Sequence, residues 1–155
     1  CLSPNNAYII MLGLESLGVR MERHCDNALT LAKYLEGHEC VKWVNYAALP
    51  NDKYNDVCKK ITNGRASGII SFGIKGGIDA GAKFIDALQM ILRVLSMGDA
   101  KSLACHPAST LHRQLTPKQK ALAGVSEDLI RISVGIEHID DIIDDVKQAI
   151  ESSQT

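Results

Sequence analysis

Two segments of the chain gather the side chains that could bind a ligand. Small, polar and charged residues crowd residues 96–112, and Arg131 stands inside the otherwise apolar segment 129–137. A charged residue in the middle of a strand-like segment is costly unless an anion meets it. The guanidinium fork matches a carboxylate with two parallel hydrogen bonds. The two segments are therefore predicted to build one anion-binding site.

A buried salt bridge is the alternative explanation for this arginine. Asp128 and Glu137 are the nearest acidic residues along the chain, and either could pair with Arg131. Ser133 lies two residues further on, so a strand would place it on the same face as Arg131. That second polar group favours a surface that faces a ligand.

Other reactive side chains in the first segment fit structural roles better than catalytic ones. Lys101 is expected to face solvent, because nothing nearby would depress its pKa for imine chemistry. Cys105 and His106 resemble a thiol and its base, but neighbouring strand residues point to opposite faces, so the pair is not expected to touch. His112 lies in a polar loop and has no assigned role.

The acidic residues near the C-terminus are predicted to be solvent-exposed. Asp140, Asp141, Asp144 and Asp145 are expected on the outer side of a helix, with the first pair in its opening turn, where negative charge suits the helix dipole. The glycine-containing segment 73–77 is too loose for a phosphate loop and is expected to turn the chain. Neither cluster predicts a metal site.

Composition excludes several classes of protein. The 155 residues are enough for one ordinary domain, and 46% hydrophobic and 23% charged residues are typical of a globular chain. A net charge of −1 leaves no basic face for nucleic acid, and no apolar run approaches the length of a membrane span. The sequence contains no C-x-x-C pair of the kind that would indicate a zinc site or a disulfide framework, so we expect reduced thiols in a cytoplasmic protein. The five cysteines are Cys1, Cys25, Cys40, Cys58 and Cys105.

The N-terminal region is predicted to be helical. Ser3 and Pro4 form a cap and a first helical position, and residues 5–17 are apolar on nearly every side. Such a helix is normally buried all round, so we expect its second face to contact another domain or subunit. Gly18 predicts a bend, and residues 19–35 an amphipathic helix.

The remainder predicts an α+β fold with a small, antiparallel-type sheet of about four strands covered by helices. The expected strands are residues 40–46, 68–75, 101–105 and 129–134. The expected helices are a turn at 57–61, a long helix at 78–95, a short helix capped by Thr116, and a final helix at 138–152 with an apolar stripe.

Several motifs resemble the Cys/Met-metabolism pyridoxal-phosphate (PLP) enzymes: cystathionine synthases and lyases, methionine γ-lyase and O-acetylhomoserine sulfhydrylase. They are L-S-P-N-N-A from Leu2, R-M-E-R-H-C-D-N-A from Arg20, S-F-G-I-K-G-G from Ser71, G-D-A-K-S-L-A-C-H-P-A-S-T-L-H from Gly98 and L-I-R-I-S-V-G-I-E from Leu129. The chain is similar to the C-terminal domain of these enzymes from end to end. The Gly98 motif looks most like the sulfhydrylase branch.

The resemblance implies that Arg131 binds the substrate α-carboxylate and that Ser102 and Leu103 line the substrate pocket. It implies a parent enzyme, expected to be a homo-oligomer, that uses PLP to replace the γ-acetoxy group of O-acetylhomoserine with sulfide or a thiol. The cofactor lysine of the family lies in a Ser-x-Thr-Lys type motif of a large domain, and that motif does not occur in this sequence. Residues 1–36 would link to that large domain, and residues 37–155 would form the small domain. The chain alone is thus expected to hold no catalytic residue, no cofactor and no metal, and to be inactive.

Some features leave other functions open. Ser96 stands where the sulfhydrylase branch usually has Asn, and Leu111 where it usually has Thr. Both departures leave the thiol and the substrate preference open. A γ-eliminating lyase or a cystathionine γ-synthase of the same family is an alternative. The chain opens with Cys1 rather than Met, which suggests a piece of a longer protein. A free-standing, non-catalytic binding or assembly module is the alternative from a different class.

Overall fold

A single five-stranded sheet organises the chain, and the computed structural model describes all 155 residues. The strands follow the order β1-β2-β5-β4-β3, and every neighbouring pair is antiparallel except β3 and β4, which are parallel. The predicted α+β class is confirmed, with one more strand than expected. The strands are β1 (Val41–Asn45), β2 (Ile69–Ile74), β3 (Leu92–Arg93), β4 (Leu103–Cys105) and β5 (Leu129–Ser133).

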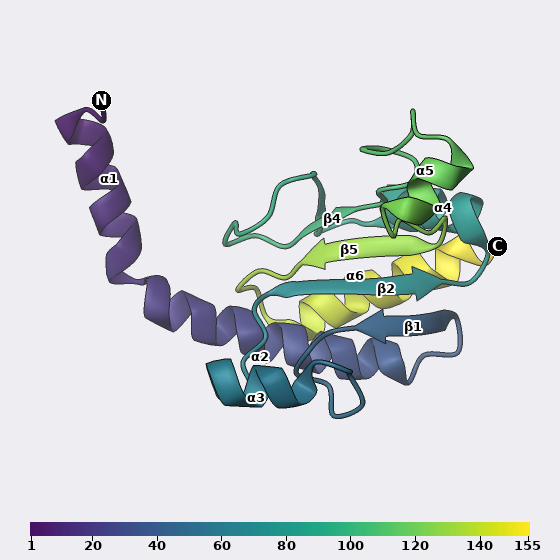
Figure 1. Ribbon diagram of the computed structural model, residues 1–155, viewed down its shortest axis with the longest axis horizontal. Coiled ribbons are helices and arrows are strands. Elements are labelled where there is room, and N and C mark those ends of the chain that lie inside the picture. The colour runs from purple at the N-terminus through teal and green to yellow at the C-terminus, as the bar shows by residue number, and fades with distance from the viewer.

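The chain also forms six helices, and Figure 1 shows their arrangement around the sheet. They are α1 (Pro4–Glu15), α2 (Leu17–Glu36), α3 (Asn55–Thr62), α4 (Gly77–Ala87), α5 (Pro117–Leu122) and α6 (Ile139–Ser153). The expected caps are present: the Ser3 hydroxyl accepts the Asn6 amide, and Thr116 forms a capping box with Gln119. None of these helices combines the length and the hydropathy of a membrane span.

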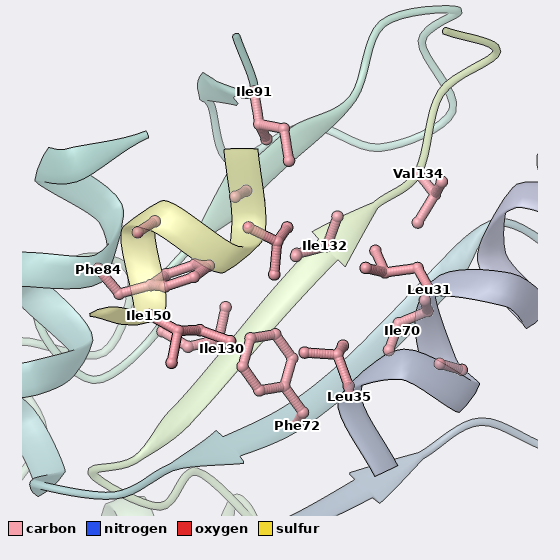
Figure 2. Packing of buried hydrophobic residues seen from close by; sticks show 14 of the residues in the cluster. Leu31, Leu35, Ile70, Phe72, Phe84, Ile91, Ile130, Ile132, Val134 and Ile150 are labelled. Atoms are coloured by element: carbon pink, nitrogen blue, oxygen red, sulfur yellow. The ribbon is translucent and has the colours of Figure 1, made fainter. Parts of the chain in front are cut away.

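The hydrophobic core lies on one face of the sheet, against α2, α4 and α6 (Figure 2). Period-2 alternation along β2 buries Ile70 and Phe72, and along β5 it buries Ile130 and Ile132. The Phe72 ring meets Phe84 of α4 edge-to-face, with ring centroids 5.8 Å apart. Because this apolar set fixes which strand residues turn inward, it also fixes which turn outward.

The outward face of the central strands carries small and polar residues. Ser71 and Arg131 occupy opposing positions in β2 and β5, and Cys105 of β4 opposes Arg131 from the other side. At Gly73, an added Cβ would lie 2.1 Å from the Trp43 indole nitrogen, so only glycine admits this ring. The polar side chains of the central strands therefore lie on the face opposite the core.

The first helix is exposed along its whole length. No residue of α1 is buried, and Figure 1 shows α1 leading away from the sheet. The bend lies at Ser16, two residues before the predicted Gly18, where the Arg20 side chain donates to the Gly13 carbonyl and the Ser16 hydroxyl. The exposed apolar side chains of α1 are Tyr8, Ile9, Ile10, Met11, Leu12 and Leu14.

Two sequence predictions about the region after α4 were wrong for the same reason. The helix expected over 78–95 ends at Ala87, and Asp145, expected to be solvent-exposed, is buried. Its carboxylate accepts the backbone amides of residues 89, 90 and 91 at 2.8–3.0 Å. These amides bond to Asp145 instead of continuing the helix, and the chain proceeds to β3. Asp140, Asp141 and Asp144 are exposed as predicted.

Candidate functional site

Arg131 lies at the centre of the outward face, on a strand flanked by β2 and β4. Its Nη2 donates to the Leu95 carbonyl at 2.5 Å and lies 3.5 Å from the Ser96 carbonyl oxygen. Neither Nε nor Nη1 has an oxygen partner. The guanidinium is thus held by the loop before β4 while part of its fork stays free.

The predicted alternative, a salt bridge from Arg131 to Asp128 or Glu137, is wrong. Asp128 pairs with Lys42 at 3.1 Å, and Glu137 bonds to Ser102. Burial works to raise the pKa of Asp128, but hydrogen bonds from Ser126 and Lys42 and the lysine charge outweigh it and lower that pKa. Arg131 is left without a carboxylate partner, as an anion site requires.

The thiol beside Arg131 is buried. Burial raises the pKa of Cys105, and the Arg131 charge and hydrogen bond only partly oppose this effect. As predicted, Cys105 does not pair with His106. The His106 Nε2 donates to the Glu127 carbonyl at 2.8 Å, so Nδ1 is free to accept from the Ser109 hydroxyl, also at 2.8 Å.

Ser102 and Leu103 lie at the end of the same loop, with buried side chains. The Ser102 hydroxyl donates to Glu137 Oε2 at 2.9 Å and accepts the Gly135 amide at 2.8 Å. These contacts bring Ser102 to the turn that follows β5, the strand of Arg131. The role of both residues in substrate binding stays a prediction.

A hollow of about 200 Å³ opens beside this loop and was not found from the sequence. Its lining includes Arg20 and His24 of α2, together with Ser133 and Gly98, whose amide donates to the Ser133 hydroxyl at 3.1 Å. His24 Nδ1 donates to the Val134 carbonyl at 2.7 Å, because a carbonyl can only accept. The R-M-E-R-H motif was the available signal, since its spacing places Arg20 and His24 one helical turn apart.

The chain's own lysines do not fit the cofactor that the motifs imply. A PLP enzyme holds its cofactor through a lysine amine in a closed site. Every lysine except Lys120 is exposed, Lys101 included, and Lys120 donates to the Ala108 carbonyl. None lines the hollow beside Ser133, so this chain does not form a complete PLP site. No group of three or more His, Cys, Asp or Glu side chains is placed to bind a metal ion.

Comparison with known proteins decides the family. The family described as Cys/Met metabolism PLP-dependent enzyme matches residues 1–151. The chain belongs to this family. The resemblance noted in the sequence is thereby confirmed, and so is PLP as the cofactor of the Cys/Met-metabolism family.

The relatives within the Cys/Met-metabolism family are named for more than one activity. The chain is 42% identical over 149 residues to O-acetyl-L-homoserine sulfhydrylase 1 of Thermus thermophilus, covering 96% of this chain and 35% of the relative. It is 46% identical over 149 residues to homocysteine synthase of Schizosaccharomyces pombe, with the same coverage. It is 43% identical over 152 residues to L-methionine gamma-lyase of Pseudomonas putida, covering 98% of this chain and 38% of that enzyme.

A solved structure of the family supports the fold and the cofactor. The putative O-acetylhomoserine (thiol)-lyase of Campylobacter jejuni, which carries a pyridoxyl-lysine monophosphate, superimposes with a TM-score of 0.90 at 42% identity. The match covers 97% of this chain and 36% of that one. The chain therefore spans little more than a third of the proteins it matches.

Proposed function

We propose that this chain is the substrate-carboxylate-binding part of a PLP-dependent enzyme that replaces the γ-acetoxy group of O-acetylhomoserine with sulfide or a thiol. The observation that carries the proposal is Arg131, a half-buried arginine with no acidic partner and with no oxygen acceptor at Nε or Nη1. Sulfhydrylases at 42–46% identity over nearly the whole chain favour this chemistry.

Arg131 is proposed to bind the α-carboxylate of the amino-acid substrate. The Leu95 carbonyl fixes the orientation of the guanidinium, and Nε and Nη1 remain to meet carboxylate oxygens. Ser102 and Leu103 are proposed to shape the pocket through the loop they end, because their side chains are buried. Binding and orientation are the contribution of these residues.

The cofactor would be supplied by the rest of the parent polypeptide. PLP acts as an electron sink for carbanion chemistry when it is bound, and this chain lacks a lysine placed to hold it. We propose that residues 1–36 connect to the cofactor-bearing domain and that the exposed apolar side chains of α1 pack against it or against another subunit of a cytoplasmic homo-oligomer. In this proposal residues 37–155 form the small domain, and the chain alone is inactive.

A γ-eliminating lyase is the second candidate, because a methionine γ-lyase is as similar to the chain as the sulfhydrylases are. Ser96 and Leu111 depart from the sulfhydrylase pattern. The full-length parent, loaded with PLP, should be assayed with O-acetylhomoserine with and without sulfide. Sulfide-dependent formation of homocysteine supports the proposal. Release of 2-oxobutanoate without any thiol, at an equal or higher rate, would contradict it and support the lyase.

The assay also separates the enzyme from a non-catalytic assembly module. The 155-residue chain measured under the same conditions should show no turnover above a blank. A parent without activity toward any amino-acid substrate would favour the assembly module instead.

A further inference from the structure

Glu137 stands out because its carboxylate is used twice by one residue of the loop beside Arg131. Glu137 Oε1 accepts the Ser102 amide at 2.6 Å, and Oε2 accepts the Ser102 hydroxyl at 2.9 Å. The same hydroxyl accepts the Gly135 amide at 2.8 Å. A carboxylate with two such donors is a strong, directional anchor, because hydrogen bonds to charged groups are the strong ones.

The turn that carries Glu137 is itself fixed to the helical layer. Asn27 of α2 donates its amide group to the Gly135 and Glu137 carbonyls at 3.0 and 2.9 Å. His24, one turn earlier, holds the Val134 carbonyl at 2.7 Å. The anchor point of the loop is therefore tied to a helix of the core rather than to another loop.

The space around this turn admits no larger residue at its centre. A Cβ at Gly135 would lie 2.2 Å from Glu137 Oε2 and 2.5 Å from both the Ala100 carbonyl and the Ser102 amide nitrogen. The Ile136 amide donates to the Ala100 carbonyl at 2.9 Å. The turn at residues 135–137 and the end of the loop at residues 100–102 are thus in close backbone contact, as a direct hydrogen bond between Glu137 and Ser102 requires.

The loop 95–102 is held near both of its ends. Arg131 donates to the Leu95 and Ser96 carbonyls at its start, and the Glu137 carboxylate accepts from Ser102 at its far end. A substrate carboxylate would meet Nε and Nη1 of Arg131, while Nη2 keeps its contact to the Leu95 carbonyl. The Glu137–Ser102 contact does not involve the guanidinium, so it can keep the loop in place while Arg131 binds the carboxylate.

We propose that Glu137 is a positioning residue. Its two hydrogen bonds to Ser102, called the clasp below, hold the loop 95–102 in place and so orient the Arg131 guanidinium for the substrate carboxylate. The inference rests on the proposed role of Arg131. The clasp itself is a property of this chain, and it is testable without any substrate.

The first test measures the clasp alone. Amide hydrogen exchange in the 155-residue chain should show the Ser102 and Gly135 amides exchanging at least about tenfold faster in Glu137→Ala than in the wild type. Glu137→Gln, which keeps one acceptor oxygen, should fall between. Glu39→Ala is the matched control, because Glu39 is exposed and makes no side-chain hydrogen bond. Unchanged exchange in Glu137→Ala would overturn the clasp.

The second test links the clasp to binding in the full-length parent. Glu137→Ala should raise KM for O-acetylhomoserine roughly tenfold and leave kcat within about threefold, with Glu137→Gln partly restoring KM. Faster exchange with an unchanged KM would overturn the positioning role. If Arg131→Ala leaves KM unchanged, the carboxylate assignment fails, while faster exchange in Glu137→Ala still supports the clasp. The two failures are thus distinguishable.

Discussion

Replacing Arg131 by alanine in the full-length parent tests the proposed site most directly. The change removes the hydrogen bonds from a guanidinium to a carboxylate, and such charged bonds are worth about 1.5–3 kcal/mol. Arg131 is only half-buried, so solvent screening places the expected loss near 2–3 kcal/mol rather than at the upper values seen for fully buried pairs. At 1.4 kcal/mol per decade, kcat/KM should fall roughly 30- to 150-fold.

The same substitution should barely affect folding. Its lost contacts, to the Leu95 and Ser96 carbonyls, lie at the surface, where water replaces the donor. We expect a change in unfolding free energy of no more than about 1 kcal/mol. A fall in activity together with an unchanged melting temperature therefore separates binding from stability.

Steady-state kinetics with O-acetylhomoserine and sulfide provides the assay. Arg131→Lys keeps the charge but loses the fork, so it should recover only part of kcat/KM. Arg23→Ala is the matched control, since Arg23 is exposed and makes no side-chain hydrogen bond or ion pair. A kcat/KM within a factor of two of the wild type in Arg131→Ala would refute the assignment of this residue.

Three further changes test the scaffold. Asp145→Ala should lower the unfolding free energy by about 2–4 kcal/mol in chemical denaturation, because three backbone amides lose their acceptor; the exposed Asp144→Ala should change it by less than about 0.5 kcal/mol. The pKa of Asp128 is lowered on folding, so its contribution to stability is present above about pH 4 and is lost as pH falls through the folded value; Asp128→Asn should flatten this loss in acid titrations. Gly81→Ala should destabilise by about 1–3 kcal/mol, because its Cβ would lie 2.5 Å from Nε2 of the buried His106, and a raised melting temperature would contradict this packing.

The fold was predictable wherever periodicity reported burial directly. Alternation along 68–75 and 129–134 located β2 and β5 and the face each one buries, because a strand with one buried face must repeat every two residues. The helix over 78–95 failed because an apolar helical pattern continues past the point where Asp145, more than fifty residues away, takes up the backbone amides. Single-sequence patterns do not reveal such a long-range acceptor.

The sequence alone singles out the arginine at the centre of the proposed site, but not the residues around it. An arginine within an apolar strand is costly, and that local cost singled out Arg131. Glu137 carries no such local signal, because its partner Ser102 lies 35 residues away along the chain. The sequence shows only the spacing of His24 from Arg20, because its partner, the Val134 carbonyl, lies 110 residues away. Their roles depend on which loop the sheet order brings beside β5.

If Arg131 binds a carboxylate as proposed, its geometry favours a preformed site over one assembled by the ligand. A guanidinium offers five N–H donors, and the Leu95 carbonyl takes one donor of Nη2. The Nε and Nη1 donors remain, so a carboxylate can bind while the contact to Leu95 persists. The loop contact then orients the fork before the substrate arrives and removes part of the entropy that ordering a long side chain would cost. Weakening the loop should therefore appear in KM before it appears in kcat, because orientation of the bound carboxylate is needed in the ground state and the transition state alike.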